Sequence, residues 1–596
     1  MHRRALLASL FLAGCSGDLI GGLTLASATD APPAADPAAP RPTPSEPTPD
    51  RPAGPVDAPH FACESPGAHG ALPAMRRLSR AELENTLEDL FGADVVDTLT
   101  TLGDYAVEPF DVHRMPSGAH PSRSSVSGLV ETMADVAERV STNPTWLRRV
   151  APACLVAGGV VSTSDRACAT AFVTEVGLRV LRRPLTAPET AAWVATLQTS
   201  TPVAPSPAER VALVLGQLLT RPEFLFLLTH QRTVEPGGTR VDAWTVASRL
   251  SYAAIGSMPD AELFEAARLG QLDTQAQRLL HARRLLTRPA TATTVHAGRR
   301  FVRSFFANWL YAFKARQADA FYSQRFGVNG GTINAAFLEE AMRFGEHVTF
   351  DSGASSFAEL MTSAAAFPPD ADTAKVMGTA VSRGSGDPRI VSDWRRGLFL
   401  RPLLLVSSEP RTSLIHRGAV FVTQLSCVDL GPIPTDADAV AAAEKEKLDL
   451  LELSGRQLAT AVTSQARCAG CHAAINPAGF VFERFGALGE QRPAEEIFDQ
   501  SRALVRTLPI EDSAELVLDG AAQRVEDPRA FAEVVSRSSQ VKACMTRQLF
   551  RQARRALDTP ADRCHLASVE AALRAGRPLL DVFATNAASE DLSWEP

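Results

Sequence analysis

The chain has 596 residues, of which 45% are hydrophobic, and its formal net charge is -7 at pH 7. This length and hydrophobic content suffice for several domains or for one large helical body. The small acidic charge is spread along the chain and excludes the basic composition typical of nucleic-acid-binding proteins. After the first residues, no stretch is long and apolar enough to cross a membrane.

The N-terminus predicts export. The basic residues Met1-His2-Arg3-Arg4 precede an apolar run from Ala5 to Ala13 that is too short to span a bilayer, which is typical of a signal peptide. The run ends at Leu12-Ala13-Gly14-Cys15, which resembles a lipobox, so that Cys15 would be lipidated. Ordinary cleavage after Ala26-Ser27-Ala28 is the alternative. In both cases we expect an extracytoplasmic protein, in the periplasm or as an outer-membrane lipoprotein held to the membrane by its lipid.

A tether is expected next, over residues 16–62. Between Ala26 and His60 the sequence consists almost only of Ala, Pro, Asp, Thr and Ser. Such a segment buries too little apolar surface to offset its ordering entropy, and proline favours an extended backbone. It would hold the folded body away from the membrane.

The remaining chain is predicted to be mainly helical. Ser79 and Glu82 form a capping box ahead of an apolar stripe, and Thr186 and Glu189 repeat the device. Three-and-four periodicity predicts further helices over Val211–Leu219, Trp244–Tyr252, Ala261–Leu269, Arg278–Leu286, Phe301–Leu310 and Phe337–Val348. We expect a signal peptide over 1–15 and the tether over 16–62, helical domains over 63–145, 146–202 and 203–350, a connecting region over 351–390, a cytochrome-c-like domain over 391–495, and a helical domain over 496–596.

The central motif is Cys468-Ala469-Gly470-Cys471-His472. This Cys-x-x-Cys-His pattern is typical of covalent haem c attachment, because the two sulfurs can each bond a haem vinyl group while the imidazole faces the iron. Cys468 and Cys471 would bind the cofactor, and His472 would be the proximal iron ligand. A redox-active pair, half of a zinc site and a plain disulfide are the alternatives. Asn476-Pro477-Ala478-Gly479 predicts a turn just after the motif.

Six cysteines remain after Cys15 and the motif are set aside. An even number in an exported chain predicts disulfides. We expect the local pairs Cys154–Cys168 and Cys544–Cys564, which leaves Cys63 with Cys427. The sequence alone does not determine this connectivity.

The sixth iron ligand is a second question. Met545 is the only methionine after the motif, which makes its thioether the first candidate for a distal ligand. The alternative is that Met545 fills a helical core beside Leu549. Four arginines are candidates for haem propionate contacts or for salt bridges: Arg182, Arg183, Arg395 and Arg396.

No catalytic set is identified. Asp260 and Glu262 follow Pro259 at an expected helix start, where carboxylates interact favourably with the helix dipole. The chain has no phosphate-binding Gly-x-x-x-x-Gly-Lys, no Gly-x-Ser-x-Gly and no His-Glu-x-x-His. Whether the protein is an enzyme is left open.

Five stretches, taken together, resemble a known family. They are Arg77–Gly92, Arg182–Thr186, Ala247–Asp260, the segment from Arg395 to Phe485 and Cys544–Ala556. They are similar, in the same order, to large secreted bacterial proteins built from consecutive domains of unknown function, related to the planctomycete-type cytochrome c group. The resemblance implies an exported, multi-domain, haem-c-like protein and implies no particular reaction. One departure is Gln552–Leu557, where an Ala-Leu-Gly-Arg-like helix end is usual.

Two functional hypotheses follow. The first is an exported, lipid-anchored c-type haem protein that transfers electrons with an unidentified donor or acceptor, as part of an extracytoplasmic oxidoreductase. The second is a non-redox surface lipoprotein that binds a polymer or a protein partner and joins Cys468 to Cys471 in a plain disulfide.

Overall fold

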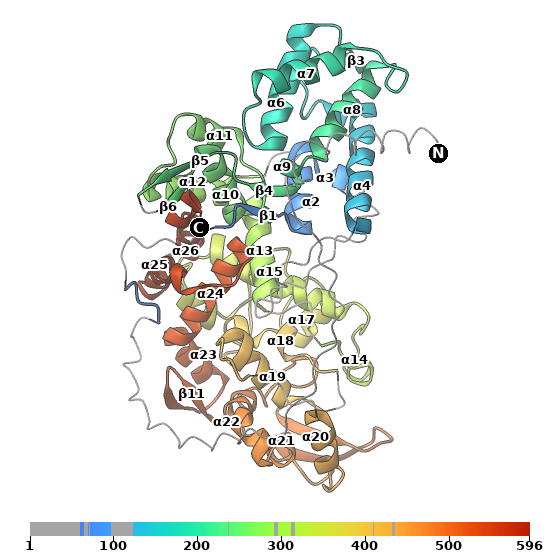
Figure 1. Ribbon diagram of the computed structural model, residues 1–596. Coiled ribbons are helices and arrows are strands. Elements are labelled where there is room, and N and C mark those ends of the chain that lie inside the picture. The colour runs from blue at the N-terminus through green and yellow to red at the C-terminus, as the bar shows by residue number, and fades with distance from the viewer. Residues whose placement is uncertain are drawn as a thin grey trace, which may run out of the picture.

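The computed structural model describes residues 60–64, 70, 72–96, 123–236, 238–290, 296–310, 316–408, 411–431 and 436–595. Cys15 and the tether before His60 lie outside these residues. The described chain is mainly helical, as expected, with a smaller part above a larger body in Figure 1. Among the described residues, no helix combines the length and the apolar character needed to cross a membrane.

The N-terminal part is a helical unit with its own core. Its helices are α2 (Arg80–Phe91), α3 (Ala93–Val96), α4 (Arg123–Thr142), α5 (Pro144–Leu147), α6 (Arg166–Leu181), α7 (Ala187–Gln198), α8 (Pro207–Leu219) and α9 (Pro222–Leu225). Both predicted capping boxes are present, at the starts of α2 and α7. One hydrophobic cluster runs from Leu78 to Leu225 and continues to Tyr252 and Met258. Residues from the expected domains 63–145 and 146–202 therefore share a single core.

The larger body follows from residue 241. Its helices are α10 (Ala243–Ile255), α11 (Ala261–Arg268), α12 (Gln275–Thr287), α13 (Ala297–Trp309), α14 (Ala320–Phe326), α15 (Ile333–Phe350), α16 (Phe357–Thr362), α17 (Ala371–Met377), α18 (Pro402–Leu405), α19 (Leu414–Val420), α20 (Ala437–Lys445), α21 (Gly455–Val462), α22 (Ala466–Phe480), α23 (Pro528–Arg537), α24 (Ser539–Arg554), α25 (Arg563–Arg574) and α26 (Leu579–Ala587). Short 3-10 turns are η2 (Leu398–Leu400), η4 (Pro560–Asp562) and η5 (Glu590–Ser593), and η3 (Phe421–Leu425) is a π-helix. One core, from Val241 to Leu592, extends across the expected boundaries at 350, 390 and 495.

Short antiparallel sheets join distant segments. β1 (Met75–Arg77) pairs with β4 (Phe226–Leu228), with Met75 opposite Leu228. The C-terminal strand β13 (Trp594–Glu595) pairs with β6 (Gly238–Val241), which also pairs with β5 (Arg232–Glu235). The other pairs are β2 (Val156–Ala157) with β3 (Val160–Val161) and β7 (Ala365–Ala366) with β8 (Arg389–Ile390). The chain end thus returns to the junction between the two cores.

Two β-hairpins lie in the segment 496–596 or at its start, where only helices were expected. They are β9 (Ala494–Phe498) with β10 (Leu504–Pro509), and β11 (Ala514–Leu518) with β12 (Ala521–Val525). β11 alternates buried and exposed residues, as a half-buried strand does. The turn before β12 is Asp519-Gly520, and both residues have positive φ, at 56° and 74°. This dipeptide is the usual signal of a two-residue hairpin turn.

Three disulfides cross-link the described chain. Cys154–Cys168 forms as predicted, but Cys544–Cys564 does not. Cys427 is instead bonded to Cys544, and Cys63 to Cys564. Cys564 lies at the start of α25 and Cys544 lies on α24. Each of them is bonded to a cysteine that is far away in the sequence, and local spacing does not predict such a pairing. Three disulfides indicate an oxidising, extracytoplasmic compartment.

Candidate functional site

The Cys-x-x-Cys-His motif lies in the first two turns of α22. The turn predicted at Asn476–Gly479 is wrong, because α22 continues through Pro477 to Phe480. Proline has no N–H to donate to the carbonyl four residues earlier. That residue is Ala473, which is exposed, so water can satisfy the carbonyl and the helix need not end.

The glycine of this segment serves helix packing instead of a turn. α22 crosses α19 at Gly418 and Gly479. A Cβ atom on Gly479 would lie 2.0 Å from the Leu414 carbonyl oxygen, and one on Gly418 would lie 2.0 Å from that of Ile475. Only glycine permits this close approach of two backbones. The crossing fixes the C-terminal half of α22 and leaves the half with the cysteines at the surface.

Cys468 and Cys471 are free thiols, whereas the other six described cysteines are in disulfides. They are three residues apart, so they lie on one face of the helix. Both are half-buried, and Cys471 Sγ donates to the Leu430 carbonyl at 3.5 Å. A Cβ atom on Gly470 would touch nothing within 4 Å, so the helix face at Gly470 is open. Both cysteines keep part of their surface exposed.

His472 is oriented by a hydrogen-bond chain. Its Nδ1 lies 3.0 Å from Asn476 Oδ1, one turn further along the helix. Asn476 Nδ2 donates to Thr463 Oγ1 at 2.8 Å, so the amide oxygen is the group left to accept from the imidazole. Nδ1 then carries the proton, and Nε2 keeps its lone pair for a metal. Ligating histidines in metalloproteins are commonly oriented in this way.

The donor set fits a haem better than a zinc ion. Among the described residues, no group of three or more His, Cys, Asp or Glu side chains is placed to hold one metal ion. A porphyrin needs fewer protein side chains around the metal, because the two sulfurs would bond its edge and a single imidazole would reach the metal. The motif also follows a helix, α21, and not the strand expected before a thioredoxin-like pair.

The other sequence-predicted residues lie elsewhere. Met545 is on α24 with its side chain fully buried in the core that also contains Leu549. Its role as a distal ligand stays a prediction, and packing already accounts for its position. Asp260 caps α11 and pairs with Arg284 at 2.6 Å, and Glu262 pairs with the same guanidinium at 2.9 Å. Both carboxylates are thus part of a helix-end ion-pair cluster.

The four arginines considered for propionate contacts have protein partners. Arg182 donates to the carbonyls of Phe224 and Phe226, and Arg395 to that of Leu400 at 2.9 Å. Arg183 pairs with Glu189, and Arg396 pairs with Asp393 at 2.9 Å. Their guanidinium groups are therefore already bound to other groups of the protein.

Arg417, to which the sequence motifs assign no role, binds the segment that follows α22. Its buried guanidinium donates to the carbonyls of Phe482 and Phe485, at 2.9 and 2.7 Å, and to that of Leu405. Burial lowers the pKa of Arg417 to about 9. The carbonyls of Phe482 and Phe485 belong to the segment that follows α22, so Arg417 holds that segment in place. A short sequence motif does not indicate hydrogen bonds between residues that are so far apart in the chain.

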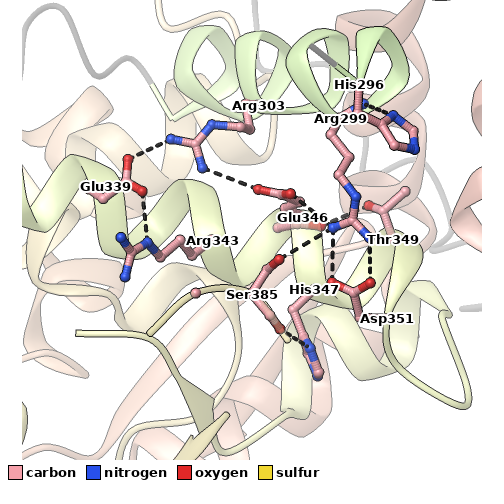
Figure 2. Close-up of polar contacts among 12 residues, drawn as sticks. His296, Arg299, Arg303, Glu339, Arg343, Glu346, His347, Thr349, Asp351 and Ser385 are labelled. Atoms are coloured by element: carbon pink, nitrogen blue, oxygen red, sulfur yellow. Dashed lines mark hydrogen bonds and ion pairs between the residues drawn. The ribbon is translucent and has the colours of Figure 1, made fainter. Parts of the chain in front are cut away.

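A cluster of charged side chains joins α13 to α15, and its charged groups are paired with one another (Figure 2). Arg299 pairs with Glu346 and Asp351, and Arg303 pairs with Glu346 and Glu339. Each carboxylate therefore faces at least one guanidinium. This arrangement is typical of an ion-pair network that holds two helices together, and we assign it a structural role.

Comparisons with known families agree with the resemblance noted above. Residues 395–495 match the PSCyt3 family model, described as a protein of unknown function (DUF1588), and residues 241–378 match PSD4, described as a protein of unknown function (DUF1592). The first match contains the whole motif and its supporting residues Thr463, Asn476 and Arg417. Neither a curated protein nor a solved structure matches the chain. The chain is therefore a mainly helical, multi-domain protein that contains domains of the planctomycete-type cytochrome-related group, whose function is unknown.

Proposed function

We propose that the domain at residues 395–495 carries one covalently attached haem c and that the protein transfers electrons outside the cytoplasm. The observation that carries the proposal is the state of α22: two unbridged, half-buried thiols one turn apart, followed by an imidazole whose Nδ1 is held by Asn476. The match to a cytochrome-related family model over the same residues supports it.

The residues of α22 have distinct roles in this proposal. Each thiol adds across one vinyl double bond, so that sulfur bonds one carbon and its proton goes to the other, without oxidation or reduction. His472 binds the iron through Nε2, and its hydrogen bond to Asn476 keeps the ring in one orientation. The bound haem would supply a one-electron couple between ferric and ferrous iron. Met545 is the first residue to test as the opposite ligand.

The structure gives no support to the second hypothesis, in which Cys468 and Cys471 form a plain disulfide, because both are free. We also propose that the protein is exported. The signal-peptide pattern, the lipobox at Cys15 and the disulfides favour an extracytoplasmic protein, in the periplasm or as an outer-membrane lipoprotein. The electron partner and any substrate are not specified by these observations.

The test is expression of the full chain in a host that matures c-type cytochromes. We expect a Soret band that stays with the protein after extraction with acidified acetone. Replacement of Cys154 and Cys168 by serine is the matched control, since it removes two cysteines far from α22 and should leave the band. A band that is extracted completely from the unaltered chain would end the proposal.

A further inference from the structure

A small cavity lies where the two cores meet. It has a volume of about 30 Å³ and is lined by Arg76 on β1, Leu227 on β4, Arg249 on α10, and Ala553 and Arg554 on α24. β1 and β4 lie with the N-terminal part, and α10 and α24 with the larger body (Figure 1). The cavity is therefore lined from both parts. Three arginines thus line one space.

Two of these guanidinium groups are paired within the protein. Arg76 binds both carboxylate oxygens of Glu82, at 2.8 and 2.9 Å. Arg249 donates to the carbonyls of Leu592 and Trp594 and to Glu595 Oε1, at 3.0 to 3.2 Å. Their charges are compensated by these partners.

Arg554 is different. Its side chain is 3% exposed, yet its Nε and Nη2 make no hydrogen bond. The carboxylate facing it is that of Asp591, whose Oδ2 is 3.7 Å from Nη2 and already accepts from Ser589. Burial lowers the pKa of Arg554, Arg76 and Arg278 lower it further, and Asp591 and Asp562 act against this. A buried cation without hydrogen-bonded compensation is costly, and an unpartnered buried donor usually marks an absent water or ion.

We propose that this cavity binds one small monovalent anion, held by Arg554 with Arg76 and Arg249 around it. Guanidinium groups bind carboxylates and halides through charge-assisted hydrogen bonds. The volume holds roughly one or two atoms of water size, which fits a halide ion or a carboxylate head and is too small for phosphate or sulfate. The bound anion would compensate Arg554 and hold the N-terminal part against α24.

Binding to the folded state alone raises stability with ligand concentration, so melting of the full chain is the first test. Sodium chloride and sodium formate are compared with sodium methanesulfonate, whose anion is too bulky for the cavity, at equal ionic strength. We expect the melting temperature to be higher by about 2 °C or more in chloride or formate. A larger shift in chloride would indicate a halide site, and a larger shift in formate would indicate a carboxylate site. Equal melting in all three salts would overturn the proposal.

Variants locate the effect. Arg554→Met should abolish the difference between salts, while Arg537→Met, on the exposed face of α23, should keep it. If Arg554→Met does not fold, crystals of the unaltered chain soaked in bromide decide. We expect an anomalous peak beside Arg554. Water density alone in the cavity, or bromide only elsewhere, would contradict the assignment.

Discussion

Helices α22 and α24 both carry cysteine and a proposed iron ligand, but they use sulfur in opposite ways. Cys468 and Cys471 on α22 are free and half-buried. Cys544 on α24 is bonded to Cys427, and Met545 next to it has no exposed surface. Sulfur at an open helix face is available for chemistry, whereas sulfur in a packed core contributes stability. The environment of each sulfur, more than its residue type, separates the two roles.

The neighbours of each helix explain this difference. The glycine crossing with α19 fixes one end of α22. The first turns of α22 can therefore lie at the surface without another helix packed over them. α24 packs on α10, α13, α25 and α26 within the main core. The predictions below test this contrast, from the largest expected effect to the smallest.

Replacing both Cys468 and Cys471 by serine should abolish covalent haem completely, because no sulfur remains on α22 to bond it. Haem bound per protein after acid extraction measures the effect. The variant with Cys154 and Cys168 replaced keeps its haem in this account. Covalent haem that persists without Cys468 and Cys471 would show that the attachment site lies elsewhere.

Replacing Cys427 and Cys544 by alanine should destabilise the protein by about 2–5 kcal/mol, since this disulfide closes a loop of more than a hundred residues. The covalent haem content of folded protein should not change. Urea unfolding measures the first quantity and absorbance the second. Loss of haem attachment with normal stability would reverse the roles given to the two helices.

Asn476→Leu should weaken the bond between His472 and the iron, because Nδ1 loses its acceptor. Supporting hydrogen bonds of this kind are worth roughly 10–100-fold in metal affinity. In an acid titration followed by visible absorbance, we expect the histidine to leave the iron about 1–2 pH units higher than in the unaltered protein. Thr463→Ser, which keeps the hydroxyl, is the control. Identical titrations for Asn476→Leu and the unaltered protein would show that Asn476 does not orient His472.

Glu483, just after α22, should make stability depend on pH. Burial raises its pKa from 4.5 to about 7, with Glu495 adding to the effect. The folded state then holds a proton that the unfolded state has lost, so this contribution is present below pH 4.5 and is lost as pH rises to about 7. Glu483→Gln should remove a decline on the order of 1–3 kcal/mol. Urea unfolding at pH 5 and pH 8 measures it, and parallel curves for both proteins would contradict it.

Met545→Leu should have the smallest effect. A volume-conserving change in a core usually costs less than about 1.5 kcal/mol, and packing in the main core already accounts for the position of Met545. The visible spectrum of the reduced protein is the measurement. A change of axial ligation in this variant would instead identify Met545 as the distal ligand and make α24 part of the haem site.

Local signals in the sequence were sufficient for much of the fold. The capping boxes at Ser79 and Thr186 and the three-and-four periodicity located helices correctly, because these patterns depend on residues within one or two turns. The hairpin turn at Asp519-Gly520 was also local, but it was overlooked among helices.

Contacts between distant residues were not accessible in this way. The pairing of Cys544 with Cys427 and the hydrogen bonds from Arg417 to the segment after α22 depend on the packing of separate helices. Proline and glycine at 477 and 479 indicated a turn by their usual preference. The helix nevertheless continues through both residues, because the carbonyl that loses its donor lies on an exposed side and the glycine packs against α19. For the candidate site, the motif identified the residues, while the orientation of His472 by Asn476 came only from the structure.

The most direct test of the central claim is mass spectrometry of the purified, matured protein and of its peptides. We expect a mass increased by one haem, with the addition confined to the peptide that contains Cys468 and Cys471. A mass without the addition, together with those two cysteines free or joined to each other in the mature protein, would contradict it.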